Sequence, residues 1–288
     1  MSSSVFIAGP AAWNTIVVLD RLPEPVPHMQ FAEATWETVG GTSAGKALSL
    51  TGLGRPTQLY ALAGDDAAGT RVREALDGAG VAVRWGAGVT ERHLNLMTRD
   101  GERVSLYLAA PEETSGEEDA WVREQLSAAD AVVLDLAAEP RRLLPLARES
   151  GTPIWVDVHD YDGVAEFHRP FLAAAHAVFC NADRLEDPVA FLHARIAAGA
   201  HLAVCTRGAD GAVAVDEHGI EHRVRALPVE VADTNGAGDA FLAGVLDARL
   251  DGAPVAAALE AGARAAATVL RSRHLHPLLD PILHLPEE

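Results

Sequence analysis

One short stretch of the sequence combines small residues with carboxylates in a spacing suited to handling a phosphate group. It reads Asp233-Thr234-Asn235-Gly236-Ala237-Gly238-Asp239-Ala240-Phe241 and precedes an apolar helical pattern. Residues 236–238 have little or no side chain, so their amides at a helix start can approach an anion closely, and the helix dipole favours negative charge there. Asp239 falls in the first turn, where its carboxylate can accept the proton of a hydroxyl that attacks phosphorus. The stretch predicts an anion hole beside a general base, although a lone Gly-x-Gly-Asp more often only caps a helix.

The overall charge and composition exclude several classes of partner. The chain has 288 residues, of which 49% are hydrophobic, and a formal net charge of -18. Because a polyanion would be repelled, we expect neither nucleic acid nor an acidic membrane surface as a partner. The start of the chain does not resemble a signal peptide, and no apolar run is long enough to span a bilayer. These features predict a cytoplasmic protein without a membrane partner.

The cysteines, the histidines and the single lysine give no signal of chemistry. Cys180 and Cys205 lie in apolar runs typical of core strands, so we predict neither a disulfide nor a metal site there. The 12 histidines show no metal-ligand spacing. Lys46 is the only lysine among the 23 basic residues. We interpret the excess of arginine as coding bias or solvation and not as a sign of chemistry.

Short apolar runs alternate with alanine-rich segments, which predicts an α/β fold with a mostly parallel sheet covered on both faces. We expect a single domain over residues 1–288. Core strands are expected at residues 5–8, 58–63, 131–136, 154–158, 177–180 and 202–206, with an edge hairpin at 211–215 and 220–224. Helices are expected at residues 44–53, 67–79, 116–128, 140–149, 188–198, 237–250 and 255–271.

Two segments, residues 14–38 and 93–109, break this rhythm by alternating polar and apolar residues. The second has a turn at Asp100-Gly101. The alternation predicts antiparallel strands with one wetted face, which could form a small sheet, or lid, over a cleft. Residues 28–37 offer an exposed strand edge, which favours a homodimer formed through the lid.

Several landmarks together resemble one family. The stretch Asp233 to Phe241 matches the C-terminal signature Asp-Thr-x-Gly-Ala-Gly-Asp of the ribokinase-like carbohydrate kinases, the phosphofructokinase-B family. Gly40-Gly41 before a helix is similar to the N-terminal signature of that family. The stretches Gly64 to Gly69 and Thr206 to Ala212 resemble its further glycine motifs, in the same order along the chain. The resemblance covers nearly the whole chain and implies a three-layer α/β/α fold with a β lid.

The resemblance also implies a function: transfer of the terminal phosphate of ATP to a hydroxyl of a sugar or sugar-like molecule. It implies ATP and Mg²⁺ as cofactors, with K⁺ as a further possibility in this family. The implied catalytic groups are Asp239 as base and Gly236, Ala237 and Gly238 as anion hole. The implied nucleotide-binding residues are Asn181, Thr206, Gly208, Gly211 and Asn235; the implied substrate-binding residues are Asn14, Gly40, Gly41 and Asp239. Asp233 would lie near a monovalent cation, and Glu186 near a water ligand of Mg²⁺.

The sequence departs from the family at several of these positions. Asn14 replaces the aspartate, and Gly45 the asparagine, that several members use to contact sugar hydroxyls. The family motif Asn-x-x-Glu would begin at Asn181 and has Arg184 in place of its glutamate. Glu186 or Asp187 could replace the glutamate only if the loop shifts, and Arg184 could instead hold phosphates. Asp157, His159 and Asp160 follow a strand end, where either a ligand role or simple capping is possible.

Other interpretations remain open. Residues 40–47 nearly form a Walker A loop, but Ala47 replaces the hydroxyl residue that would bind magnesium. Gly41-Thr42-Ser43-Ala44-Gly45 matches the Gly-x-Ser-x-Gly of hydrolases with Ser43 as nucleophile, although small residues opening a tightly packed helix explain it more simply. A nucleoside kinase or a non-catalytic sugar or nucleotide sensor on the same fold is a further alternative.

Overall fold

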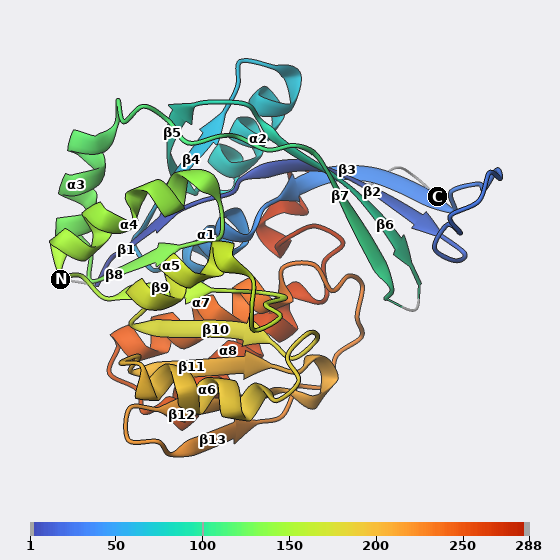
Figure 1. Cartoon of the computed structure of the whole chain (residues 1–288). Helices are drawn as coiled ribbons and strands as arrows, with labels where there is room; N and C mark the ends of the chain where they lie inside the picture. The colour runs from blue at the N-terminus through green and yellow to red at the C-terminus, as the bar shows by residue number, and fades with distance from the viewer. Residues whose placement is uncertain (1–2, 100, 285–288) are drawn as a thin grey trace.

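The computed structural model of the chain describes residues 3–99 and 101–284. Figure 1 shows two sheets, a large one between two layers of helices and a small one that extends beyond it. Within these ranges, the large sheet contains nine strands: β1 (Val5–Ala8), β4 (Thr57–Ala63), β5 (Ala82–Ala87), β8 (Ala131–Leu134), β9 (Ile154–Asp157), β10 (Ala177–Asn181), β11 (Leu202–Thr206), β12 (Ala212–Asp216) and β13 (Glu221–Val224).

The strand order of the large sheet is β13-β12-β11-β10-β9-β8-β1-β4-β5. The strands from β11 to β5 run parallel, and β12 and β13 are antiparallel to their neighbours. The central strands read as continuous apolar runs because both of their faces are covered. Their carboxyl ends meet at one edge of the sheet, which is where ligands bind in this class of fold.

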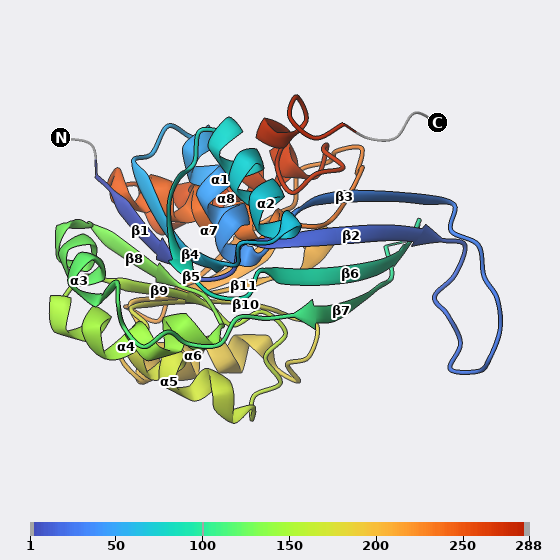
Figure 2. The ribbon, with the colours of Figure 1, turned by 90° about the horizontal axis from the view of Figure 1, so that it is seen from above.

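Among the described residues, eight helices form the two layers that cover this sheet (Figure 2). One layer contains α1 (Thr42–Gly52), α2 (Ala67–Gly78), α7 (Ala237–Leu250) and α8 (Val255–Val269); the other contains α3 (Asp119–Ala128), α4 (Ala138–Ser150), α5 (Arg169–Ala174) and α6 (Pro188–Ala197). Short 3₁₀ turns occupy Glu166–His168, Gly208–Asp210 and Pro277–Leu279. Alternate strand residues serve the two layers: Val5 and Ile7 belong to the core under α1 and α7, and Phe6 and Ala8 to the core under α3 and α4.

The small sheet, which we call the lid, has the strand order β3-β2-β6-β7. Its strands are β2 (Ala12–Leu19), β3 (Ala34–Gly40), β6 (Glu91–Thr98) and β7 (Arg103–Ala109). The pairs β2–β3 and β6–β7 are antiparallel, whereas the central pair β2–β6 is parallel. The parallel pairing has a simple cause: β2 and β6 each follow a parallel strand of the large sheet after only three residues, so both leave it in the same direction.

The fold class predicted from the sequence is confirmed, a mostly parallel central sheet with a small sheet beside it. The small sheet is antiparallel in its outer pairs, as predicted, but parallel in its central pair β2–β6. The helix predicted at residues 237–250 agrees with α7 at both ends. The sequence analysis does not predict β5 or α5, because β5 alternates at the sheet edge and α5 has only six residues. The turn predicted at Asp100-Gly101 includes Asp100, which lies outside the described residues. Within the described ranges, no helix has the length and hydropathy needed to cross a membrane.

Helix α7 packs closely against α8 because glycines face one another. A Cβ added to Gly262 would lie 2.7 Å from Val245 Cγ2 and 2.8 Å from the Phe241 carbonyl oxygen. A Cβ added to Gly244 would lie 2.7 Å from the Ala261 carbonyl oxygen. Neither contact leaves room for a larger residue, so these glycines fix where the start of α7 lies.

The packing of α7 on α8 predicts the effect of filling this contact. Gly262→Val should lower the free energy of unfolding by about 1–3 kcal/mol, because overpacking a close contact forces the helices apart. Ala256→Val adds bulk at an exposed position of the same helix and should change the stability by less than about 0.5 kcal/mol. Urea denaturation followed by circular dichroism measures both. Equal effects of the two substitutions would contradict the packing argument.

Candidate active site

A cavity of about 910 Å³ lies between the carboxyl ends of the central strands and the inner face of the lid. Its lining comes from β2, β3, β6 and β7, from the ends of β9, β10 and β11, and from the start of α7. These elements are far apart in the sequence and meet at one edge of the sheet (Figure 2). The arrangement places the charged residues of several loops around one space.

The start of α7 presents open backbone to this cavity. Gly236 precedes the helix in the left-handed conformation with φ of 77°, and a Cβ there would lie 2.9 Å from the Leu275 carbonyl oxygen. Gly238 lines the cavity, and a Cβ on it would meet no atom within 4 Å. A side chain at position 238 would therefore fill the space that an anion needs to approach the amides. Gly236 and Gly238 of the predicted anion hole line the cavity, whereas Ala237 is not part of its lining and its amide donates a hydrogen bond of 3.4 Å to the Thr234 carbonyl oxygen.

Asp239 lies in the first turn of α7, lines the same cavity and is 8% exposed. The Lys46 ammonium donates a hydrogen bond of 2.6 Å to Asp239 Oδ1. Among the described residues, no hydrogen bond reaches Oδ2. One oxygen of this carboxylate is thus held by the protein, and the other is available to a ligand.

The motifs in the sequence assign no role to Lys46. Its side chain is completely buried within α1, and its ammonium lies between three aspartates. The Nζ atom lies 2.6 Å from Asp239 Oδ1, 2.9 Å from Asp135 Oδ1 and 3.6 Å from Asp157 Oδ2. A charge buried to this degree is tolerated only when it is paired, and here the partners include the predicted base. Sequence reasoning missed this lysine even though it interrupts the otherwise uncharged run Ser43–Leu50.

The charges around Asp239 shift the acidities of the cluster. Burial raises the pKa of Asp239 to about 6, and Lys46 and His159 oppose this rise. Burial also favours a higher pKa for Asp157, but His159 and Lys46 outweigh it and hold that pKa below its usual value. Burial acts to lower the pKa of Lys46, yet Asp135, Asp239 and Asp157 raise it well above its ordinary range. Lys46 therefore stays protonated while Asp239 changes its charge near neutral pH.

Gly45 leaves space for the predicted base. A Cβ at this position would lie 2.8 Å from Asp239 Oδ2 and 3.1 Å from Asp239 Cβ. The missing side chain therefore has a packing reason, since any larger residue would displace the carboxylate. Gly9 has a similar role, because a Cβ there would lie 2.3 Å from Ser43 Oγ.

The hydrolase and Walker A interpretations do not agree with the structure. Ser43 is completely buried and donates a hydrogen bond of 2.6 Å to Asp135 Oδ2, so its hydroxyl cannot reach a substrate. Lys46 points into the three aspartates, where no phosphate could lie without repulsion from their charges. Small residues that open a buried helix explain the sequence of residues 40–47.

The predicted nucleotide residues come together in part. Asn181, Thr206 and Gly208 line the cavity at the ends of β10 and β11, and Asn235 lines it beside α7. Gly211 does not line it. Its φ is 87°, and a Cβ there would lie 2.0 Å from the Val224 carbonyl oxygen, so this glycine is required by the turn into β12.

On the substrate side, Asn14, Gly40 and Gly41 all line the cavity. A Cβ on Gly40 would lie 2.0 Å from Asn14 Nδ2, so this glycine makes room for the asparagine. The alternation of the lid strands brings further polar side chains to the same face, and none of them was predicted from the sequence as a site residue. These are Thr38, Glu91, His93, Asn95, Arg103, Ser105 and Tyr107. Period-two alternation along β6 and β7 was the signal that could have identified them.

Contacts between the lid and the start of α7 tie the two walls together. Arg103 Nη1 donates a hydrogen bond of 2.5 Å to Asn235 Oδ1. The side-chain Nδ2 of Asn235 donates a hydrogen bond of 2.9 Å to Asp233 Oδ1. Asp233 is buried and lines the cavity, and burial raises its pKa.

Glu186, in the acidic loop after β10, was expected near a water ligand of Mg²⁺ but does not lie at the cavity. Glu186 and Arg184 are exposed and do not belong to the cavity lining. Asp160 and Asp183 do line it, and Asp160 accepts a hydrogen bond from Asn181 Nδ2. Asp157 and His159, for which capping of a strand end is the commoner role, also line the cavity.

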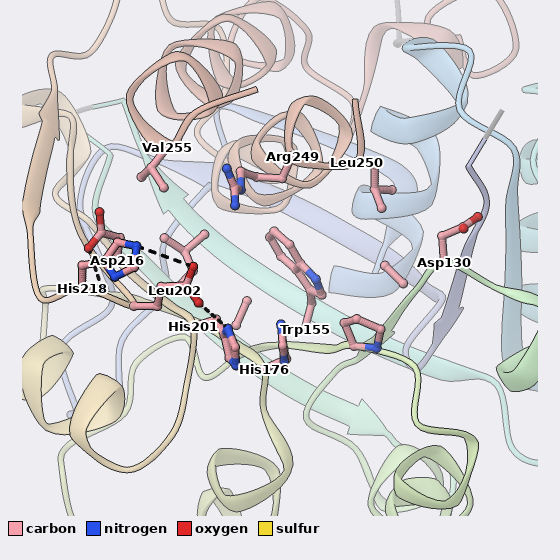
Figure 3. Close-up of a pocket in the computed structure, with 14 residues that line it drawn as sticks. Asp130, Trp155, His176, His201, Leu202, Asp216, His218, Arg249, Leu250 and Val255 are labelled. Atoms are coloured by element: carbon pink, nitrogen blue, oxygen red, sulfur yellow. Dashed lines mark hydrogen bonds and ion pairs between the residues drawn. The ribbon is translucent and has the colours of Figure 1, made fainter. Parts of the chain in front are cut away.

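Figure 3 shows a second pocket, of about 360 Å³, at the amino ends of the central strands. Trp155, His176, His201 and Leu202 contribute to its wall. Two of its lining side chains pair with each other: His201 Nδ1 lies 2.7 Å from Glu217 Oε2. Ligands in such folds bind at the carboxyl ends of the strands, and this pocket lies at the opposite edge of the sheet. We therefore assign the chemistry to the larger cavity.

Comparisons with known proteins agree with this geometry. The sequence profile of the family described as "pfkB family carbohydrate kinase" matches residues 14–279. The acarbose 7(IV)-phosphotransferase of Actinoplanes sp. is 33% identical over 275 residues, which cover 92% of this chain and 91% of that protein. The ATP-dependent ribose-1-phosphate kinase of Halopiger xanaduensis is 32% identical, with 89% of this chain and 88% of that protein covered. Among solved structures, a microbiome-derived acarbose kinase, Mak1, has a TM-score of 0.81 and 30% identity and covers 93% of this chain and 92% of its own.

The environment of Asp239 predicts where this carboxyl titrates. With ¹³C-labelled aspartate, its carboxyl signal should have a midpoint near pH 6 and not near the ordinary 3.8. The folded chain then binds this proton more tightly than the unfolded chain, so its contribution to stability is lost as the pH rises from about 4 to about 6. The Asp239→Asn variant identifies the signal by its disappearance. As the pH rises through the same interval, the Asp239→Asn variant should become more stable relative to the unsubstituted protein, because it lacks the carboxyl whose contribution is lost. A midpoint below about pH 4.5 would contradict this account.

Proposed function

The chain belongs to the pfkB family of carbohydrate kinases, and on this basis we propose that it phosphorylates a hydroxyl of a sugar or glycoside with Asp239 as the base. Its relatives are ATP-dependent phosphotransferases that act on sugars and nucleosides. One observation carries the assignment of the base: a buried carboxylate faces the cavity in the first turn of α7, directly after Gly238, whose backbone is open to the same cavity. Base and anion hole meet at one helix start.

The proposed reaction is an in-line transfer. The substrate hydroxyl gives its proton to Asp239 while its oxygen forms a bond to the γ-phosphorus of ATP. The bond from this phosphorus to the β–γ bridging oxygen breaks, and its electron pair leaves with ADP. The amides of residues 236–238 stabilise the charge on the transferred group. Asn181, Thr206, Gly208 and Asn235 hold the nucleotide, and Gly211 maintains the shape of its loop.

We propose that the substrate binds under the lid, against Asn14, Gly40 and Gly41. The inner face of the lid is polar, as a ligand with many hydroxyls requires. Within the described residues, the buried Oδ1 atoms of Asn14 and Asn95 have no hydrogen-bond partner. Such atoms are costly unless a ligand or water satisfies them, and hydroxyl groups can do so. Two relatives at 30% identity or more are named acarbose kinases, which favours a glycoside of that kind.

Mg²⁺ is proposed as the ion that accompanies ATP. The described residues contain no group of three or more His, Cys, Asp or Glu side chains arranged to hold a metal. This fits Mg²⁺, which in phosphoryl-transfer sites is held mainly by phosphate oxygens and waters with one or two carboxylates. Asp160 and Asp183 would hold its water ligands, with the exposed Glu186 further out on the same loop. The bound ion would neutralise phosphate charge beside an acidic protein.

We also propose Asp233 as a ligand for a monovalent cation such as K⁺. Its buried carboxylate has a raised pKa, and a bound cation would stabilise the ionised form. Omission of K⁺ from the assay, with choline in its place, tests this assignment.

The proposed assembly is a homodimer of single-domain subunits of residues 1–288, joined through their lids, in the cytoplasm, where ATP is supplied. The lid offers suitable surface: Leu106 and Leu108 of the edge strand β7 are exposed, as are Met29 and Phe31 in the loop before β3. An edge strand with exposed apolar residues favours pairing with a second chain. Sedimentation of the Leu106→Glu variant against the unsubstituted protein tests the interface.

The proposed reaction predicts the behaviour of Asp239→Asn. Phosphate transfer from γ-labelled ATP is measured across acarbose, maltose, ribose, fructose, adenosine and inosine. We expect turnover with glycosides, and a fall in kcat of about 10²–10⁴-fold in the variant, since loss of a general base has that magnitude.

The pattern of substrates separates the candidate functions. Preference for a nucleoside would replace the sugar assignment with a nucleoside kinase, and binding without turnover on every compound would favour a sensor. Undiminished turnover in Asp239→Asn would remove this residue from the mechanism. The Ser43→Ala variant is the control for α1, and a loss of all activity there would revive the hydrolase interpretation.

A further inference from the structure

The only lysine of the chain lies beneath the proposed base. Every other basic residue among the 23 is an arginine. Lys46 is also one of the largest side chains with no exposure at all. A lysine kept at one buried position, in a chain that otherwise uses arginine, points to a requirement that arginine does not meet. A compact ammonium can contact carboxylates from three directions, whereas a planar guanidinium is larger and binds as a fork.

The three aspartates around Lys46 come from three different elements. Asp239 belongs to α7, Asp135 follows β8, and Asp157 ends β9. Asp135 is completely buried and also accepts a hydrogen bond from Ser43. Asp157 lies 3.4 Å from His159 Nδ1 and accepts a hydrogen bond from the His159 amide. Two of the three carboxylates thus have further protein partners.

Asp239 differs from the other two. Among the described residues its only hydrogen-bond donor is Lys46, at 2.6 Å from Oδ1, and its side chain is exposed to the cavity. Gly45, next to Lys46 in the same helix turn, leaves the space that Oδ2 occupies. Two neighbouring residues of α1 therefore determine both the charge next to the base and the space around it.

We propose that Lys46 is a positioning residue for phosphoryl transfer: its ammonium is a built-in counter-ion that holds Asp239 by Oδ1 and leaves Oδ2 to receive the substrate proton. The inference rests on the proposed function, with Asp239 as base. Lys46 itself does not line the cavity and does not touch substrate. It acts through Asp239. The proton taken from the substrate resides on Asp239 and not on Lys46, because the lysine ammonium already carries three protons and cannot accept another.

The charged groups that face Asp239 have opposite effects on its ionisation. Lys46 from α1 and His159 after β9 favour the carboxylate, whereas Asp135 after β8 disfavours it, and Asp157 is the third carboxylate around the same ammonium. Removal of the lysine and removal of Asp135 should therefore move the ionisation of the base in opposite directions. A residue that only stabilised the fold would not produce this pair of opposite shifts.

The test is the pH dependence of kcat for the full chain, with the best substrate of the panel and saturating ATP. In Lys46→Met the midpoint of the acid limb, where kcat falls as the base becomes protonated, should shift to higher pH by about 1–3 units. The reason is that a nearby opposite charge lowers the pKa of a carboxyl by that amount, and the variant removes this charge. At pH 7 its kcat should fall by about twofold to 100-fold, with the KM for ATP nearly unchanged. In Asp135→Asn the acid limb should move down.

The matched control is Arg55→Met. Arg55 also forms a mostly buried ion pair with α7, at 2.7 Å from Asp247 and 2.6 Å from Asp251, but far from the base along that helix. The control should lose stability and keep the acid limb of the unsubstituted protein. An acid limb that stays in place in Lys46→Met, or that moves in the same direction in Asp135→Asn, would overturn the proposal.

A second measurement keeps the proposal testable if Lys46→Met does not fold. Because the chain has one lysine, labelling with ¹³C,¹⁵N-lysine gives one side-chain signal in NMR. The Cε shift of this signal should follow the titration of Asp239 near pH 6 and lose that step in Asp239→Asn. A signal without that step would overturn the inference. If Asp239→Asn instead retains full turnover, the assignment of the base fails, whatever the lysine shows.

Discussion

A carboxylate can take a proton only while it is ionised, and burial works against ionisation. Asp239 is subject to both conditions, because it is 8% exposed and yet faces the cavity. The Lys46 ammonium, 2.6 Å away, supplies the charge that makes the buried carboxylate tolerable. The pair joins α1 to α7, so the two helices must keep a fixed spacing. Close packing serves the same end, through Gly45 beneath the carboxylate and Gly244 and Gly262 between α7 and α8.

Much of the fold could be predicted from the sequence because local patterns dictate it. Continuous apolar runs in β1, β8 and β11 mark strands covered on both faces, and their positions agree with prediction within a few residues. The bounds of α7 are predicted correctly because a glycine-rich start and a long apolar pattern are both local signals. The parallel pairing of β2 with β6 is not local. It depends on where two distant segments leave the large sheet, which no pattern within either segment states.

The site follows the same division. The motif at residues 233–241 predicts the proposed anion hole and base, since both depend on residues close together in the chain. The partners of the base come from positions 46, 135 and 157, and only the folded chain brings them together. Glu186 illustrates the reverse case: a motif suggests it, but the loop after β10 turns Asp183 toward the cavity instead. Spacing in the sequence predicts contacts within a turn of helix, and it does not predict contacts between loops of different strands.

The absence of a side chain at position 45 also constrains how such a site can change during evolution. Exchange of Gly45 for asparagine cannot leave the rest of the site unchanged, because the new Cβ would lie 2.8 Å from Asp239 Oδ2. The base would have to shift, and its ion pair with the adjacent lysine would lengthen. Positions 45, 46 and 239 are therefore epistatic: the effect of a substitution at one depends on the residues at the others. Divergence at this site should proceed by coupled exchanges, so the dipeptide Gly-Lys should be inherited as a unit.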